Sequence, residues 1–251
     1  MYNRGPFADW VPKPVMLLLI LIFLFPIMAV SGVYSNNMTD ISGYLGGMTE
    51  IVSFANNCVT IGMSLAMLII MRVKMRFRTK EIVAGGAVIV GILVYMCGTT
   101  HNYYVFIGAN LIIGFIKMFM MLEIIIVVMF ILSPTGDRRQ FYSIFYPIAI
   151  GSSSIMFKYV SELVFDQGIQ SAYILFGCIM FGLAALSIIF QHNQRFSFKL
   201  PLYQIDWLSI FLLGGSFMCM NYVLVFCKQQ NWFNSPYIQI NAILSILFMA
   251  F

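Results

Sequence analysis

Charged residues are scarce in this sequence. Only 9% of its 251 residues are Asp, Glu, Lys or Arg, compared with about 25% in an average soluble domain, and 61% are hydrophobic. A water-soluble fold is therefore excluded. The sequence also lacks the HExxH and GxSxG signatures of hydrolytic enzymes, and its two histidines, His101 and His192, fall in separate loops. We expect neither an enzyme nor a cofactor.

Metal-ligand and nucleic-acid-binding patterns are missing too. The five cysteines lie within or at the ends of apolar runs, and no two of them have CxxC spacing: Cys58, Cys97, Cys178, Cys219 and Cys227. Packing explains them without a metal. The net charge of +5 arises mostly from short basic segments between apolar runs, and no basic amphipathic face is present. Nucleic acid is not an expected partner.

Long apolar runs are what the sequence has in abundance. A helix needs about 20 apolar residues to cross a hydrocarbon core that is roughly 30 Å thick. Seven runs are of that kind, and an eighth begins near Pro236 and continues to Phe251. The seven runs are 14–34, 43–71, 82–98, 104–132, 141–164, 170–190 and 206–227. We predict an all-α polytopic membrane protein with about seven full transmembrane helices and a truncated eighth, the N-terminal part of a longer chain.

The basic residues predict the orientation of these helices. Eleven of the 14 Lys and Arg residues fall on one side: Arg4, Lys13, Arg72, Lys74, Arg76, Arg78, Lys80, Arg138, Arg139, Arg195 and Lys199. The other side has Asp40, His101, Asp166 and one basic residue, Lys228. The positive-inside rule then places the N-terminus in the cytoplasm, and we expect a bacterial inner-membrane protein. A cleaved signal peptide at the first run would destroy this alternation, so we reject it.

Polar residues form a stripe along the second apolar run. They recur at steps of three and four, which places them on one face of a helix: Glu50, Ser53, Asn57, Thr60 and Ser64. A water-filled pathway or substrate cavity is one interpretation, and a helix seam held by small and polar side chains is the other. We favour the cavity, because Glu50 would be costly in a dry seam.

Two charged residues lie within the fourth run. Lys117 is near its middle, with Asn110 one heptad earlier on the same face. A charge at that depth costs at least about 2.5 to 3.5 kcal/mol, so Lys117 is expected to face a cavity, a carboxylate or both. Glu123 lies about 120° around the helix from Lys117. Its partner is therefore expected on another helix.

A further lysine lies toward the outer end of the fifth run. Lys158 is one helical turn from Glu162, so a local pair is the simplest interpretation. The alternative is that Lys158 meets Glu50 of the second run and forms an outer gate. Both interpretations stay open at the level of sequence.

The order of these features resembles the major facilitator superfamily. The basic segment from Arg72 to Lys80 occupies the place of that family's signature between its second and third helices, although the glycines and the Asp of the signature are absent. The segment Gln204-Ile205-Asp206-Trp207 and the later Lys228–Phe233 are similar to the fourteen-helix drug:proton antiporter branch. That resemblance implies a six-helix bundle over residues 1–194, and over 195–251 a cytoplasmic linker with the first two of the following helices.

The resemblance also implies a function. It predicts proton-coupled efflux of small amphipathic or drug-like molecules, with the lipid bilayer, a small-molecule substrate and protons as partners, and it leaves periplasmic or outer-membrane partners unknown. The expected substrate or proton pathway is Glu50, Asn57, Asn110, Lys117, Glu123 and Lys158. The expected cytoplasmic gating loop is Arg72, Lys74, Arg76 and Arg78. The alternatives are a transporter of another substrate class and a non-transporting bundle that serves as a subunit or anchor.

Overall fold

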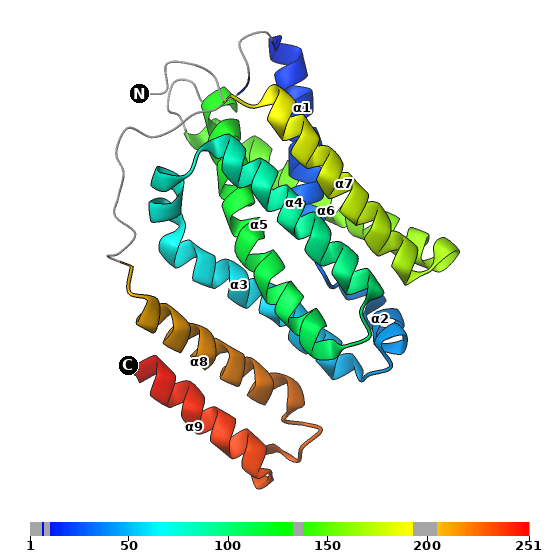
Figure 1. The fold of residues 1–251 in the computed structure, drawn as a ribbon, viewed down its shortest axis with the longest axis vertical. Coiled ribbons are helices and arrows are strands. Elements are labelled where there is room, and N and C mark those ends of the chain that lie inside the picture. The colour runs from blue at the N-terminus through cyan, green and yellow to red at the C-terminus, as the bar shows by residue number, and fades with distance from the viewer. Residues whose placement is uncertain (1–6, 8–10, 133–137, 193–204, 251) are drawn as a thin grey trace.

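The computed structural model describes residues 7, 11–132, 138–192 and 205–250, and Figure 1 shows that they form long helices packed side by side. The helices are α1 (Lys13–Ala29), α2 (Met38–Leu45), α3 (Thr49–Arg76), α4 (Thr79–Thr99), α5 (Tyr103–Leu132), α6 (Arg138–Gln167), α7 (Ile169–Phe190), α8 (Trp207–Phe226) and α9 (Pro236–Ala250). Two short 3₁₀ turns, Ser35–Asn37 and Trp232–Asn234, complete them. Within these ranges there is no strand, only one isolated bridge between Phe7 and Gln191.

Five of the helices are long and apolar enough to cross a membrane. They are α3, α4, α5 as far as Ile126, α7 and α8. The apolar part of α1 and the whole of α9 are shorter apolar helices, and the predicted run 141–164 is contained in the 30-residue helix α6. An all-α multi-pass membrane protein is therefore confirmed, whereas the count of seven full spans remains a prediction.

Glycines allow the closest helix contacts. A Cβ on Gly62 of α3 would lie 2.1 Å from the Leu111 carbonyl oxygen, and one on Gly114 of α5 would lie 2.0 Å from the Val59 carbonyl oxygen. The backbones of α3 and α5 therefore touch, as they do in membrane helix pairs built on small residues. This pair packs most extensively, followed by α4 with α7.

The other helices flank this centre. α1 packs mainly on α6, while α8 and α9 form a hairpin that lies beside α3 (Figure 1). The Ser216 hydroxyl of α8 donates to the Ser245 carbonyl of α9 over 2.7 Å. At the start of α8, the hydroxyl and the backbone N–H of Ser209 donate to the Asp206 carboxylate, and these bonds lower the pKa of Asp206.

Two predicted boundaries are wrong, and both matter for the site. The first run does not stay helical to residue 34, because α1 ends at Ala29, three residues after Pro26. The second run is divided by a turn at Gly46, whose φ of 65° is left-handed, into α2 and α3. α3 then continues to Arg76, so most of the predicted basic loop is helix.

The bridge from Phe7 to Gln191 places the start of the chain beside the end of α7. Six membrane crossings between Phe7 and Gln191 would return the chain to the side on which it started. The contact between these two residues therefore agrees with the alternation of the first six predicted runs. The predicted boundary between residues 194 and 195, and the basic residues Arg4, Arg195 and Lys199, lie outside the described residues.

Candidate functional site

The first apolar run is interrupted inside the bundle. After α1 ends, residues 30–34 are not helical, and the two residues at the ends of this stretch, Val30 and Tyr34, have extended backbone. All five residues are buried, with Val30 fully enclosed. Non-helical backbone at membrane depth occurs where it is covered by protein or lines a cavity. We call residues 30–34 the α1 break.

Lys117 of α5 binds the α1 break. Its Nζ donates to the carbonyl oxygens of Met28 and Val30, both over 2.8 Å. These carbonyls belong to the C-terminal end of α1, where a cation is stabilised by the helix dipole and by unsatisfied acceptors. From the sequence, Lys117 was expected to face a cavity or a carboxylate. Backbone carbonyls are a third kind of partner, and they became available only because α1 ends early.

Further polar side chains surround the α1 break. The Tyr173 hydroxyl of α7 donates to the Gly32 carbonyl over 2.6 Å. Asn110 of α5, which is fully buried, donates from Nδ2 to the Phe106 carbonyl. Within the described part of the chain, neither the Asn110 Oδ1 nor the buried hydroxyl of Tyr34 has a hydrogen-bond partner. Lys117, Asn110, Tyr173 and Tyr34 therefore gather around one piece of irregular backbone, and two of them hold unused polar atoms.

Glu123 has a partner on another helix, as expected. Lys74, in the last turn of α3, donates to the Glu123 Oε2 and to the Thr79 hydroxyl at the start of α4. The side chains of Lys74 and Glu123 are only 6% and 2% exposed. The other carboxylate oxygen, Oε1, is buried and has no hydrogen-bond partner among the residues that the structure describes. Together with Thr79, this pair connects α3, α4 and α5.

The predicted gating loop is therefore not one unit. Lys74 was predicted in the loop after the second run, but it lies in the last turn of α3, where it is buried and paired. Arg72 is half-buried on α3, and no residue that the structure describes bonds its Nη1. Arg76 ends α3, and Arg78 lies in the turn before α4, where Glu81 bonds its backbone N–H over 3.0 Å. The spacing of the basic residues in the sequence did not indicate which of these side chains is buried.

The polar stripe of α3 combines both interpretations. Asn57 donates to the Oδ1 of Asn221 on α8 over 2.8 Å, and the amide of Asn221 donates to the Phe54 carbonyl. At this point the stripe is a helix seam. Beside the seam is an open cavity of about 330 Å³, lined by Asn57, Thr60, Ile61, Ser64, Phe217, Met220, Asn221 and Leu224. Glu50 lies in the first turn of α3 and is half-buried, and its carboxylate accepts a hydrogen bond from the Thr49 hydroxyl.

The structure brings Lys158 to Glu162 rather than to Glu50. The Lys158 Nζ lies 3.9 Å from the Glu162 Oε1 on the same helix, and the two side chains are 80% and 63% exposed. The local pair is therefore what this conformation contains. Nearby, the Ser161 hydroxyl donates to the side chain of Asn37, which connects α6 to the turn before α2.

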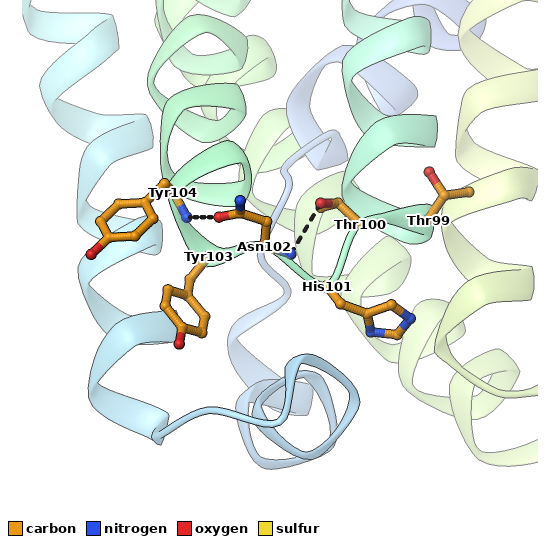
Figure 2. Close-up of a pocket in the computed structure, with 6 residues that line it drawn as sticks. All are labelled: Thr99, Thr100, His101, Asn102, Tyr103 and Tyr104. Atoms are coloured by element: carbon orange, nitrogen blue, oxygen red, sulfur yellow. Dashed lines mark hydrogen bonds between the residues drawn. The ribbon is translucent and has the colours of Figure 1, made fainter.

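A wide hollow lies at the loop between α4 and α5. Figure 2 shows the residues that line it: Thr99, Thr100, His101, Asn102, Tyr103 and Tyr104. Its volume is about 660 Å³. The Asn102 side chain accepts from the Tyr104 N–H at the start of α5, and the His101 ring packs at a tilted angle against Tyr44, with ring centroids 4.9 Å apart. The lining residues are exposed except for the half-buried Thr100, and the tyrosines suit a membrane–water interface. We assign this hollow to the interface and not to a binding site.

Comparison with known proteins adds no family. No family model matches the chain, and no curated protein matches it. In the described ranges there is also no cluster of three His, Cys, Asp or Glu residues suited to a metal ion. The function must therefore be argued from the buried charges and the irregular backbone.

Proposed function

We propose that this chain is part of a proton-coupled membrane transporter that exports small amphipathic molecules across a bacterial inner membrane, with its N-terminus in the cytoplasm. The observation that carries the proposal is the buried Lys74–Glu123 pair. Charged groups inside membrane bundles are expensive and mark ion or proton pathways. Glu123 takes the role of the proton-titrating group, and Lys74, rather than Lys117, is its charge partner.

The geometry of the pair suits proton binding. Glu123 bonds Lys74 through Oε2 and leaves Oε1 unused, so a proton has a free oxygen to bind. Protonation removes the negative charge and weakens the attraction that joins α3 to α5. Lys74 also bonds Thr79 at the start of α4, so contacts among three helices respond to one proton. A charge-dependent contact between helices is the kind of two-state element that transport requires.

The pairing of helices supports the major facilitator architecture within this proposal. Among the first six long helices, the most extensive contacts between non-consecutive ones are α3 with α5, α4 with α7, and α1 with α6. Exchanging the first three (α1, α3, α4) with the next three (α5, α6, α7) converts the α1–α6 pair into the α5–α3 pair and the α4–α7 pair into itself. Such a relation is expected of nested three-helix repeats in each half of these transporters.

The second candidate is a bundle without transport activity, a subunit or an anchor. The seam between Asn57 and Asn221 favours it, because that part of the polar stripe is used to hold helices together. In this case Glu123 and Lys74 only stabilise assembly. Their removal would then lower stability without any change in proton movement.

The test uses the full-length protein in sealed vesicles that contain a pH-sensitive dye. A panel of amphipathic compounds is added, and the internal pH is recorded for the wild type, Glu123→Gln and the matched control Glu162→Gln. We expect substrate-dependent pH changes in the wild type and the control and none in Glu123→Gln. Absence of any pH change in the wild type across the panel, or an unchanged response in Glu123→Gln, would contradict the proposal.

A further inference from the structure

We propose that the α1 break binds the carboxylate of an organic acid, with Lys117 as its anchoring cation, so that the transported compounds are amphipathic anions. That these compounds are transported rests on the proposed function, whereas the binding site depends on other residues. The Lys74–Glu123 pair takes no part in it. The site consists of Lys117, Asn110 and Tyr34 around residues 28–34.

Lys117 is a cation whose two hydrogen-bond acceptors are uncharged. Lys117 is bonded to two neutral carbonyls, and no carboxylate lies within 4 Å of its Nζ among the residues that the structure describes. Glu123, on the same helix, is engaged by Lys74. An ammonium has three N–H donors, so one remains after the two carbonyl bonds. A carboxylate is the group that supplies both the missing acceptor and the missing negative charge.

Two buried polar atoms at the α1 break have no hydrogen-bond partner among the residues that the structure describes. The Tyr34 hydroxyl and the Asn110 Oδ1 are buried, 2% and 0% exposed as residues, and neither has a partner. Buried polar atoms of this kind are rare and need an explanation. The hydroxyl can donate to an anion, whereas Oδ1 can accept from a hydroxyl or amide of the same compound. Neither atom is needed to hold the α1 break together.

Aromatic rings surround the side chain of Tyr34. The ring of Tyr34 lies 5.3 Å from that of Phe176, 5.8 Å from that of Tyr173 and 6.5 Å from that of Phe157. The Tyr34 ring is thus packed among aromatic side chains, which would face the apolar body of a ligand that reaches the Tyr34 hydroxyl. Because sites for small organic molecules combine apolar surfaces with a few polar groups, we take the ligand to be a carboxylic acid with an apolar, aromatic-compatible body.

The structure shows this site closed. Gly32 is so near to Asn110 that a Cβ would lie 2.3 Å from the Asn110 Oδ1. A ligand enters when residues 30–34 move away, and Lys117 then exchanges the carbonyls of Met28 and Val30 for the carboxylate. The anion therefore binds the opened state and shifts the population toward it. In this way ligand binding releases the end of α1.

The test measures thermal unfolding of the purified full-length protein with three carboxylates, namely benzoate, octanoate and 1-naphthoate. The matched amines, benzylamine, octylamine and 1-naphthylmethylamine, test the sign of the charge, and sodium chloride tests a bare anion. A ligand that binds only the folded state raises Tm by mass action. We expect carboxylates to raise Tm in a saturable manner, while amines and chloride do not.

The variants are Lys117→Gln, Lys117→Arg and Tyr34→Phe, and the control is Lys228→Gln, which removes an exposed lysine outside the predicted pathway. We expect Lys117→Gln to weaken carboxylate binding by at least about tenfold, since a hydrogen bond to a charged group contributes that much or more. Lys117→Arg should retain most of the binding. If Lys117→Gln does not fold, Tyr34→Phe, which breaks no existing bond, should still weaken binding by a few fold.

The outcomes separate this inference from the proposed function. No saturable shift with any of the three carboxylates, an equal shift with the amines, or unchanged binding in Lys117→Gln and Tyr34→Phe overturns the inference. Substrate-dependent pH changes with cations alone would then leave proton-coupled transport intact. Conversely, carboxylate binding that depends on Lys117, without any proton movement in vesicles, supports the anion site and contradicts the transport proposal.

Discussion

Two lysine–glutamate pairs in this molecule have the same chemistry and opposite surroundings. Lys74 and Glu123 are buried and join α3 to α5, whereas Lys158 and Glu162 are mostly exposed and lie one turn apart on α6. The first pair closes an interhelical contact, so each charge depends on the other for its solvation. The second pair has solvent or headgroups available to both charges. Context therefore decides whether an ion pair inside a hydrophobic sequence holds the fold together.

The difference has a structural origin. α3 and α5 touch through Gly62 and Gly114, and this close approach brings Lys74 and Glu123 within reach of each other. α6 contacts α1 and α7, and the face that carries Lys158 is not covered by other residues of the described chain. Close backbone approach is thus the condition for the buried pair.

The largest effect is expected for Gly62→Leu. The new Cβ would lie 2.1 Å from the Leu111 carbonyl oxygen, so the two backbones must separate. Separation breaks the Lys74–Glu123 contact as well, and we expect a loss of unfolding free energy above about 4 kcal/mol. SDS-induced unfolding in mixed micelles measures it. The control is Gly85→Leu on α4, where a Cβ meets nothing within 4 Å, and an equally large loss there would contradict the close-contact explanation.

The next effect concerns the pair itself. Lys74→Met leaves Glu123 buried without its cation, and we expect a loss of about 3 to 5 kcal/mol. The double variant Lys74→Met with Glu123→Leu removes both charges and should recover most of that loss. Unfolding of the two single variants and the double variant gives the coupling energy. Additive losses would mean that the two side chains do not depend on each other.

A smaller effect is expected at the seam between α3 and α8. Asn57→Ala removes a hydrogen bond to Asn221, and such interhelical bonds contribute about 0.6 kcal/mol on average in membranes. Ser64→Ala is the control, because the Ser64 hydroxyl bonds the Thr60 carbonyl of its own helix. A loss in Asn57→Ala no larger than in the control would show that the seam is held by apolar packing alone.

The sequence was sufficient for the features that depend on local composition. Apolar runs predicted the membrane class, and the spacing of Lys158 and Glu162 made their local contact one of two interpretations that the sequence left open. Hydropathy and helical periodicity are properties of neighbouring residues, so they need no knowledge of the fold. The partner of Glu123 was a different problem. That partner was expected on another helix, but Lys74 could be identified only after α3 and α5 were placed together.

The α1 break was missed for a related reason. Pro26 and Gly32 lie within an apolar run, and both residue types are common in transmembrane helices, so they did not reveal an interruption. What stabilises the break is the set of donors from α5 and α7, namely Lys117 and Tyr173. Those donors are distant in sequence. A lone lysine in the middle of a run, together with a proline in an earlier run, is the signal that could have suggested it.

The smallest effect is expected for the exposed pair, and it completes the comparison. Lys158→Gln and Glu162→Gln should each change the unfolding free energy by less than about 0.5 kcal/mol, because exposed i,i+4 pairs are screened and contribute little. The same unfolding measurement, repeated at low and high salt, checks both the size and its screening. A loss in either variant as large as that of Lys74→Met would mean that α6 is covered at Lys158 by another part of the assembly. The exposed face would then be an interface, and burial, not residue type, would again account for the cost.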